Sequence, residues 1–246
     1  MSIPAISFQS LSKVYGDVTA VDDLCLDIHE GEFFGLLGPN GAGKTTSLNT
    51  IAGLVKPTDG TVVIKGMDAI RQYRQVHRLV GITFQDIVLD DRFLNVREIL
   101  VYQAGYFGIP LRHARNRADE LLQRFDLWDK RDARCQELSG GMKRRLMIAK
   151  ALVHQPPVII LDEPTAGADV QLRLLIWEMM KEFHAQGKTI VLTTHYIEEA
   201  ETLCDRVAIL NQGKLVAEGT PEQLMKQQNQ RQLQDVFLQL VRADSE

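Results

Sequence analysis

The sequence predicts an α/β protein with a mainly parallel sheet that helices cover on both faces. Short apolar runs typical of strands alternate with stretches of helical spacing along the 246 residues. A glycine-rich loop at 38–43 follows one of these runs and opens a helix, and two adjacent acids end a later run. Alternation of strands and helices favours parallel pairing, because each helix carries the chain back to the same edge of the sheet.

The strands are expected where β-branched and aliphatic residues cluster between turn residues. In chain order they are predicted at 6–8, 24–28, 32–37, 62–64, 81–84, 158–161 and 189–193.

The remaining elements follow from turn chemistry and helical spacing. Gly16-Asp17 predicts a turn between the first two strands, and 45–54 predicts a helix that stops near a glycine and a proline. A hairpin is expected over 206–218, with its turn at 211–213. A final helix over 233–241 carries its apolar residues on one face.

The domain organisation is expected to be simple, since no repeat or low-complexity tract divides the chain. One domain is predicted over approximately 5–235 of residues 1–246. Between about 90 and 155 charge rises and helical spacing dominates, which predicts a helical insert between strands. Residues 220–246 are expected to form a C-terminal helical extension.

Composition excludes several classes of protein. Twenty-eight basic and 32 acidic residues give a net charge of −4, which argues against strong non-specific binding of nucleic acid. No apolar run approaches the roughly 18 residues that span a bilayer, and the N-terminus resembles no signal peptide. The three scattered cysteines lack metal-ligand spacing and are interpreted as small residues in a reducing cytosol.

The strongest local signal is the loop after the strand at 32–37. It fits the pattern G-x-x-x-x-G-K-[ST], and its place between a strand and a helix is the context that a nucleotide phosphate loop requires. The backbone N–H groups of such a loop point at phosphate oxygens. Lys44 is expected to reach the β- and γ-phosphates, and Thr45 to offer its hydroxyl to Mg²⁺. The predicted nucleotide-binding residues are Gly38, Pro39, Asn40, Gly41, Ala42, Gly43, Lys44, Thr45 and Thr46.

Two adjacent carboxylates, Asp162 and Glu163, end the apolar run 158–161. After a phosphate loop, an acid in this place orients the metal ion. Neighbouring side chains on a strand point to opposite faces. We therefore expect Asp162 to face Mg²⁺ and Glu163 to face the position from which water attacks.

Further motifs identify a family resemblance. The run Leu138-Ser139-Gly140-Gly141-Met142 precedes the acidic strand, and His195 follows the next strand. With Tyr15 and Gln85, these residues appear in the order found in the ATP-binding-cassette (ABC) ATPases, which the chain resembles over nearly its whole length. The resemblance implies a phosphate-loop (P-loop) NTPase fold with an N-terminal antiparallel β-subdomain and an inserted helical subdomain.

The resemblance also implies roles for single residues. Tyr15 is expected to stack on the adenine ring, and Gln85 to join the Mg²⁺ shell and sense a membrane partner. Glu163 is expected to polarise the attacking water and His195 to contact the γ-phosphate, so these two are the predicted catalytic residues. Asp169 matches the loop that meets an opposite subunit.

The resemblance also implies a dimer, through the Ser139-Gly140-Gly141 run. Serine is a good helix N-cap and two glycines allow close approach to an anion. In the family, this motif clamps the γ-phosphate of ATP bound to a second subunit, so a second copy of the chain is the expected partner. The structural alternative is a capped helix start without a ligand.

The sequence departs from the family pattern at Met142, where glutamine is usual, and at Ala168, where leucine or valine is usual. Met142 has no amide donor, but the glycine N–H groups and Ser139 remain. The run 142–146 and the ending 233–238 resemble a branch that serves drug and polysaccharide exporters.

The function implied is ATP hydrolysis, with MgATP as substrate, that powers a separate integral-membrane permease, most simply an exporter. We expect the chain in the cytoplasm, peripheral on the cell membrane, with the groove near 85–91 passing motion to the permease. The alternative is a soluble cassette ATPase that acts on nucleic acid or the ribosome. Such proteins usually carry two cassettes or a long coiled coil, and neither is evident here. A GTPase is disfavoured because no guanine-reading Asn-Lys-x-Asp motif occurs.

Overall fold

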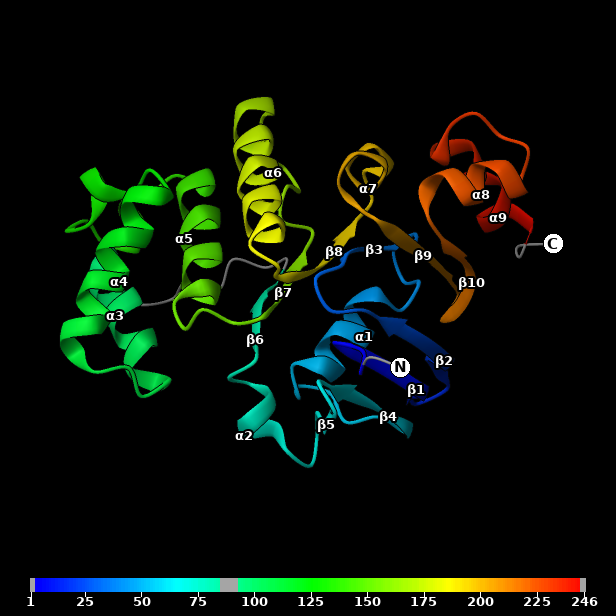
Figure 1. The fold of residues 1–246 in the computed structure, drawn as a ribbon, viewed down its shortest axis with the longest axis horizontal. Coiled ribbons are helices and arrows are strands. Elements are labelled where there is room, and N and C mark those ends of the chain that lie inside the picture. The colour runs from blue at the N-terminus through cyan, green and yellow to red at the C-terminus, as the bar shows by residue number, and fades with distance from the viewer. Residues whose placement is uncertain (1–2, 85–92, 244–246) are drawn as a thin grey trace.

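The computed structural model describes residues 3–84 and 93–243 and contains two sheets with helices around them (Figure 1). The larger sheet has six strands in the order β10-β9-β3-β8-β7-β6. All neighbouring pairs are parallel except the edge pair β9–β10, which is an antiparallel hairpin. The expectation of a mainly parallel sheet is confirmed. Its strands are β3 (Phe33–Leu37), β6 (Val80–Thr83), β7 (Val158–Asp162), β8 (Thr189–Thr194), β9 (Arg206–Asn211) and β10 (Lys214–Gly219).

The smaller sheet is antiparallel and comes from the N-terminal part of the chain. It has the order β2-β1-β4-β5, with the strands β1 (Ile6–Tyr15), β2 (Val18–Ile28), β4 (Asp59–Ile64) and β5 (Met67–Asp68). The turn between β1 and β2 lies at Gly16-Asp17, as predicted. Figure 1 shows this sheet beside α1 (Lys44–Ile51), which lies between it and the larger sheet.

The strands β1 and β2 are longer than expected. A bulge interrupts the alternation of apolar and polar residues by which their full length could have been predicted. Ser10 adopts a left-handed backbone with φ 47°, and the β1–β2 register shifts between Phe8 and Leu11. The apolar and polar residues of β1 therefore do not alternate regularly, and alternation is the signal by which a half-buried strand is recognised.

Both faces of the larger sheet are buried, as the side chains of β3 show. Phe33 and Phe34 are both fully buried, but they belong to two different apolar clusters on opposite faces of the sheet. The face of Phe34 packs on α1 and the antiparallel sheet. The face of Phe33 packs on the helices that follow β6 and β7.

The region after β6 is helical, as the spacing predicts. It contains α3 (Val96–Tyr106), α4 (Leu111–Arg124) and α5 (Gly140–Leu152), with short 3₁₀ turns at Trp128–Lys130 and Cys135–Glu137. Arg97 of α3 binds Asp119 of α4 through two hydrogen bonds of 2.5 and 2.7 Å. Buried residues of these helices share one continuous apolar cluster with Phe33 and Leu37 of the sheet.

Five further helices complete the described fold: α2 (Tyr73–Val76), α6 (Val170–Ala185), α7 (Ile197–Leu203), α8 (Pro221–Gln227) and α9 (Leu233–Ala243). Leu233 and Val236 of α9 are fully buried, and α9 packs on α7 and α8 (Figure 1). Its apolar face thus packs within its own chain.

The three cysteines are free thiols. Cys25 on β2 is exposed, and Cys135 and Cys204 are buried. Within residues 3–84 and 93–243, no helix combines the length and apolar character needed to cross a bilayer.

Candidate functional site

The glycine-rich loop joins β3 to α1 in a conformation that only glycine accommodates at its last position. Gly43 has φ 101°, and a Cβ atom there would lie 2.5 Å from the carbonyl oxygen of Ala20. No side chain caps the first turn of α1, which begins at this loop. Its leading N–H groups and the positive end of the helix dipole are therefore suited to an anion such as a phosphate.

Lys44 is the first residue of α1 and is buried, with 5% of its surface exposed. Its Nζ donates to the carbonyl oxygens of Gly38 at 2.6 Å and Pro39 at 3.1 Å. Burial lowers the pKa of the ammonium group, and the nearby carboxylates of Glu163 and Asp162 oppose that shift. The loop thus folds over its own lysine and concentrates positive charge at the end of β3.

Asp162 is the last residue of β7 and faces Thr45 across the site. Its Oδ2 lies 3.4 Å from the hydroxyl of Thr45, and its Oδ1 accepts a 2.5 Å hydrogen bond from Thr193 of β8. Burial raises the pKa of Asp162, and the hydrogen bond from Thr193 opposes that rise. Thr193 fixes the orientation of this carboxylate, a role that no sequence motif indicates.

The pair Thr45–Asp162 fits the chemistry of Mg²⁺, which prefers hydroxyl and carboxylate oxygens and keeps several positions for water and phosphate. In the part of the chain that the structure describes, no group of three or more His, Cys, Asp or Glu side chains suits a metal held by protein alone. A metal that arrives with a nucleotide matches this sparse set of ligands.

Glu163 and His195 meet at the carboxyl ends of β7 and β8. The imidazole Nδ1 of His195 lies 3.1 Å from Oε2 of Glu163. Glu163 is buried whereas His195 is exposed, so the pair spans from the interior to the surface. Glu163 adopts a left-handed backbone with φ 47°, which turns it away from the direction that β7 gives Asp162. The two predicted catalytic residues therefore lie together.

Tyr15 lies at the end of β1, next to the β1–β2 turn, and 46% of its surface is exposed. The Nζ of Lys13 lies 4.8 Å from the centre of its ring. The neighbouring strand β2 touches the phosphate loop, since Ala20 lies against Gly43. An exposed aromatic ring on this hairpin is available for stacking on a base.

The Ser139-Gly140-Gly141 run starts α5. Ser139 is its N-cap and accepts a 3.3 Å hydrogen bond from the backbone N–H of Met142. Ser139 and Gly140 are exposed. Figure 1 shows α5 beside α3 and α4, apart from α1 and its phosphate loop. Within one chain, the structure does not bring this run to Lys44.

Asp169 is the N-cap of α6, where its Oδ1 accepts a 2.8 Å hydrogen bond from the N–H of Leu172. Two apolar side chains next to it, Val170 and Leu174, are 68% and 51% exposed. This apolar surface beside a capped turn is suited to contact with another protein. Gln85 and the groove residues of 85–91 lie outside the described residues.

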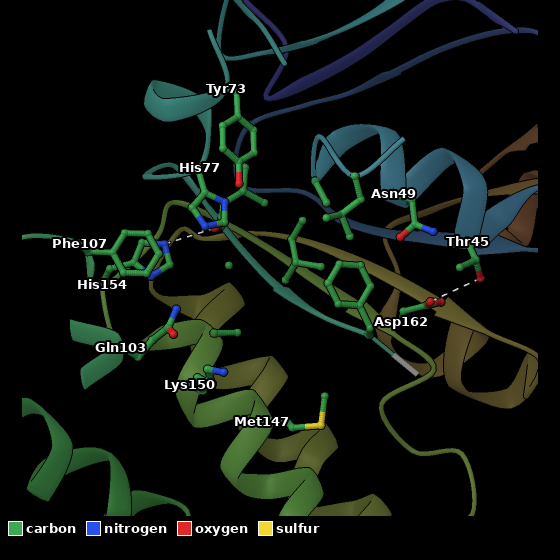
Figure 2. Close-up of a pocket in the computed structure, with 17 residues that line it drawn as sticks. Thr45, Asn49, Tyr73, His77, Gln103, Phe107, Met147, Lys150, His154 and Asp162 are labelled. Atoms are coloured by element: carbon green, nitrogen blue, oxygen red, sulfur yellow. Dashed lines mark hydrogen bonds between the residues drawn. The ribbon is translucent and has the colours of Figure 1, made fainter. Parts of the chain in front are cut away.

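A pocket of about 530 Å³ adjoins Thr45 and Asp162 and runs toward α2 and α3. Figure 2 shows these two residues at one end of the pocket and an aromatic cluster at the other. Side chains of α3 and α5 line the wall between them. The labelled lining residues are Thr45, Asn49, Tyr73, His77, Gln103, Phe107, Met147, Lys150, His154 and Asp162.

The aromatic cluster is a row of stacked rings that joins α2, α3 and the end of α5. Tyr73 stacks on His77 at 5.4 Å, His77 on Phe107 at 5.5 Å, and Phe107 on His154 at 3.7 Å. Burial lowers the pKa of His154 to about 4 and lowers that of His77. Both imidazoles are therefore neutral at pH 7. No sequence pattern marks this cluster, because its members are distant in sequence and carry no motif.

Comparison with known proteins identifies the family. A model of the family described as ABC transporter matches residues 21–166, which include Lys44 and Glu163. The Nod factor export ATP-binding protein I of Burkholderia orbicola is 46% identical over 226 residues, which cover 92% of this chain and 74% of that protein. The chain belongs to the ABC transporter family. It is an ATP-binding ATPase subunit, as its motifs imply.

Other members of the family support this assignment. A protein of the same name from Paraburkholderia xenovorans is 48% identical over 221 residues, covering 90% of this chain and 72% of its own. A solved ATP-binding subunit of an ABC transporter is 30% identical with a TM-score of 0.89, over 96% of this chain and 99% of that chain. A dimeric cassette, MJ0796, bound to ADP and Pi, is 29% identical with a TM-score of 0.78, over 87% of this ABC ATPase and 98% of that chain.

Proposed function

We propose that two copies of this chain enclose two MgATP molecules, hydrolyse them, and thereby drive export through a separate membrane permease. The observation that carries the proposal is the division of the site. Lys44, Asp162, Glu163 and His195 converge at the ends of neighbouring elements, whereas the Ser139 run lies elsewhere on the same chain.

Phosphate binding depends on the loop and its lysine. The loop N–H groups would hold the β- and γ-phosphates, and Lys44 would turn from the carbonyl oxygens of Gly38 and Pro39 toward phosphate oxygens. Thr45 and Asp162 would hold Mg²⁺, and Tyr15 would stack on adenine. When bound, Mg²⁺ neutralises charge on the phosphate oxygens. Asp162 is oriented for this role by Thr193.

Hydrolysis depends on Glu163 and His195. Glu163 would accept a hydrogen bond from the attacking water and polarise it, while His195 contacts the γ-phosphate. The water oxygen would form a bond to the γ-phosphorus while the bond from that phosphorus to the β–γ bridging oxygen breaks, and ADP would leave with the electron pair of the broken bond. The proton of the water would pass to phosphate through Glu163 and His195. The 3.1 Å contact between the two side chains supports their action as a unit.

The second copy would complete each site. Ser139, Gly140 and Gly141 of one copy would approach the γ-phosphate bound to the other, with Asp169 at the junction between the copies. The exposure of Ser139, Gly140 and Asp169 supports this contact, as do the exposed apolar residues Val170 and Leu174. MJ0796, a similar cassette, is described as a dimer in a post-hydrolysis state.

Transport requires a permease, for which the pocket beside Asp162 is the proposed docking place. A permease segment bound there would contact both α3 and the residues of the metal site. Closure of the two ATPase copies around nucleotide would therefore move the permease segment. Gln85 is proposed to join the Mg²⁺ shell and to sense the permease. Export is favoured because the Burkholderia and Paraburkholderia relatives are named for export. The proposed location is the cytoplasmic face of the membrane.

The experiment that tests the proposal combines two measurements. The full chain, tagged and purified from detergent-solubilised membranes, is expected to bring with it a protein with several membrane spans. Glu163→Gln with MgATP is expected to double its mass in light scattering, and Glu163→Gln mixed with ADP is the control. Copurification with ribosomes or nucleic acid instead of a permease would overturn the export role in favour of the soluble alternative.

A further inference from the structure

A buried carboxylate behind the catalytic pair has no role in the proposed mechanism. Glu199 lies on α7, four residues after His195, and none of its surface is exposed. A buried charge is costly unless its oxygens are hydrogen-bonded or paired. Among the described residues, Glu199 is paired with no lysine or arginine, and its partners are neutral donors.

Three elements supply these donors. The hydroxyl of Thr165, in the loop after β7, donates to Oε1 of Glu199. The indole Nε1 of Trp177, on α6, donates to the same oxygen at 3.0 Å. The hydroxyl of Thr194, the last residue of β8, donates to Oε2 at 2.6 Å. One carboxylate therefore joins the loop after β7, the end of β8 and helix α6.

The places of these donors in the chain matter for the reaction. Thr165 follows Glu163 by two residues, and Thr194 directly precedes His195. Thr194 also accepts a 2.9 Å hydrogen bond from the N–H of Tyr196, so the backbone on the far side of His195 is held as well. Glu199 thus binds residues beside both members of the catalytic pair without touching either.

The loop that carries Glu163 needs such support. Glu163 has a left-handed backbone, which is sterically costly for a residue with a side chain. Its carbonyl oxygen accepts a 3.1 Å bond from the N–H of Ala166, and that of Thr165 accepts a 3.0 Å bond from Ala168. The turn ends at Asp169, the start of α6, which also carries Trp177.

We propose that Glu199 is a positioning residue for ATP hydrolysis. It holds the loop after β7 and the end of β8 in one arrangement, which sets the contact between Glu163 and His195. Through Trp177 it ties that arrangement to α6 and Asp169, the proposed contact with the second copy. The inference rests on the proposed roles of Glu163 and His195.

The test is the steady-state ATPase activity of Glu199→Gln in the full chain. Glutamine has nearly the same size but only one oxygen acceptor for three donors. Displacement of catalytic groups by about 1 Å can cost about 10²-fold in rate. We expect kcat to fall at least about tenfold, while KM and the Kd for ATP stay within about twofold, because the phosphate loop is untouched.

The matched control is Glu198→Gln, the same chemical change at the preceding, exposed position of α7. Its kcat and KM are expected to equal those of the unmodified chain. Circular dichroism and thermal unfolding of both variants measure the fold. Equal activity of Glu199→Gln and Glu198→Gln, in a chain that hydrolyses ATP, would overturn the inference.

A second pair of variants serves if Glu199→Gln does not fold. Thr165→Val removes the hydroxyl donor at nearly constant size, whereas Thr165→Ser restores it. We expect Thr165→Val to lower kcat with an unchanged Kd for ATP and Thr165→Ser to recover most of the loss. Equal kcat in the two variants, or a parallel fall of ATP binding and kcat, would overturn the inference. Absence of ATPase activity in the unmodified chain would instead overturn the proposed function.

Discussion

The phosphate loop and the Ser139 run are both helix starts rich in glycine, but they differ in what surrounds them. Lys44 and Asp162 are buried and hydrogen-bonded within the chain, so both side chains are held at the site before a ligand arrives. Ser139 and Gly140 are exposed, and the N-cap bond to Met142 is internal to α5. The phosphate-loop region is preorganised, whereas the Ser139 run is exposed on the surface, where a second copy could contact it. This arrangement is expected when each chain supplies half of a shared site.

The largest expected effects come from breaking one region at a time. Lys44→Ala removes the cation of the loop, and Gly141→Asp places a negative charge where the second copy's γ-phosphate is expected. Each variant alone is expected to lose nearly all ATPase activity, measured by phosphate release. Lys44→Ala should also weaken ATP binding, whereas Gly141→Asp should leave ATP binding to the monomer intact.

Mixing these two inactive variants sharpens the comparison. In a mixed dimer, one site pairs an intact Lys44 with an intact Gly141, and the other site has neither. Half of the dimers in an equal mixture are mixed, so about a quarter of the unmodified activity should return. If the two regions act within one chain, mixing will restore nothing.

Glu163→Gln tests the preorganised region by removing one carboxylate at nearly constant side-chain size. Loss of general-base assistance typically costs about 10²–10⁴ in rate. We expect the rate constant of hydrolysis to fall by that amount, with ATP binding retained, in a single-turnover assay with labelled ATP. Turnover within threefold of the unmodified chain would remove Glu163 from its role. The exposed acid Glu198 again provides a control, as Glu198→Gln.

A smaller effect is expected from His154, at the aromatic end of the pocket, and it concerns the free energy of unfolding. Folding lowers the pKa of His154 from 6.5 to about 4, so the unfolded chain binds the proton more tightly. Its contribution to stability is present above pH 6.5 and is lost as the pH falls toward 4. After allowance for partial solvent exposure, the loss is about 1–2 kcal/mol. Urea unfolding at pH 7 and pH 4.5 should show a smaller pH dependence in His154→Phe.

The smallest effect is expected at Met142, directly after the Ser139 run. Its backbone N–H already donates a hydrogen bond to the hydroxyl of Ser139, and its side chain packs against the apolar core. Met142→Gln would add one amide that can reach a phosphate, and a single neutral hydrogen bond contributes about 1 kcal/mol. We expect kcat/KM to rise by no more than about fivefold. A larger rise would mean that the motif is weakened by its methionine.

The parts of this molecule that could be predicted from sequence are those with local chemistry. The loop before Lys44 must be rich in glycine to turn tightly, and Asp162 must end a strand to face that loop. Both requirements produce local motifs that can be recognised in the sequence. The N-terminal strands were underestimated because Ser10 shifts their register. The row from Tyr73 to His154 comes together only through tertiary packing, which no local pattern records.

The same distinction applies to the proposed catalytic pair. Glu163 and His195 could be placed by motif, but the carboxylate that holds their neighbours could not. Glu199 lies in an ordinary-looking acidic helix, where Glu198 and Glu201 are exposed and Glu199 is not. Only the structure distinguishes a solvated acid from one that three donors surround.

The uneven exposure of the three thiols has a practical consequence. With Cys135 and Cys204 shielded and Cys25 open to solvent, a maleimide dye should label the native chain at one place, on strand β2. Donor- and acceptor-labelled batches could then be mixed without engineering the background. Energy transfer between them would follow association and separation of two copies in real time as nucleotide is consumed.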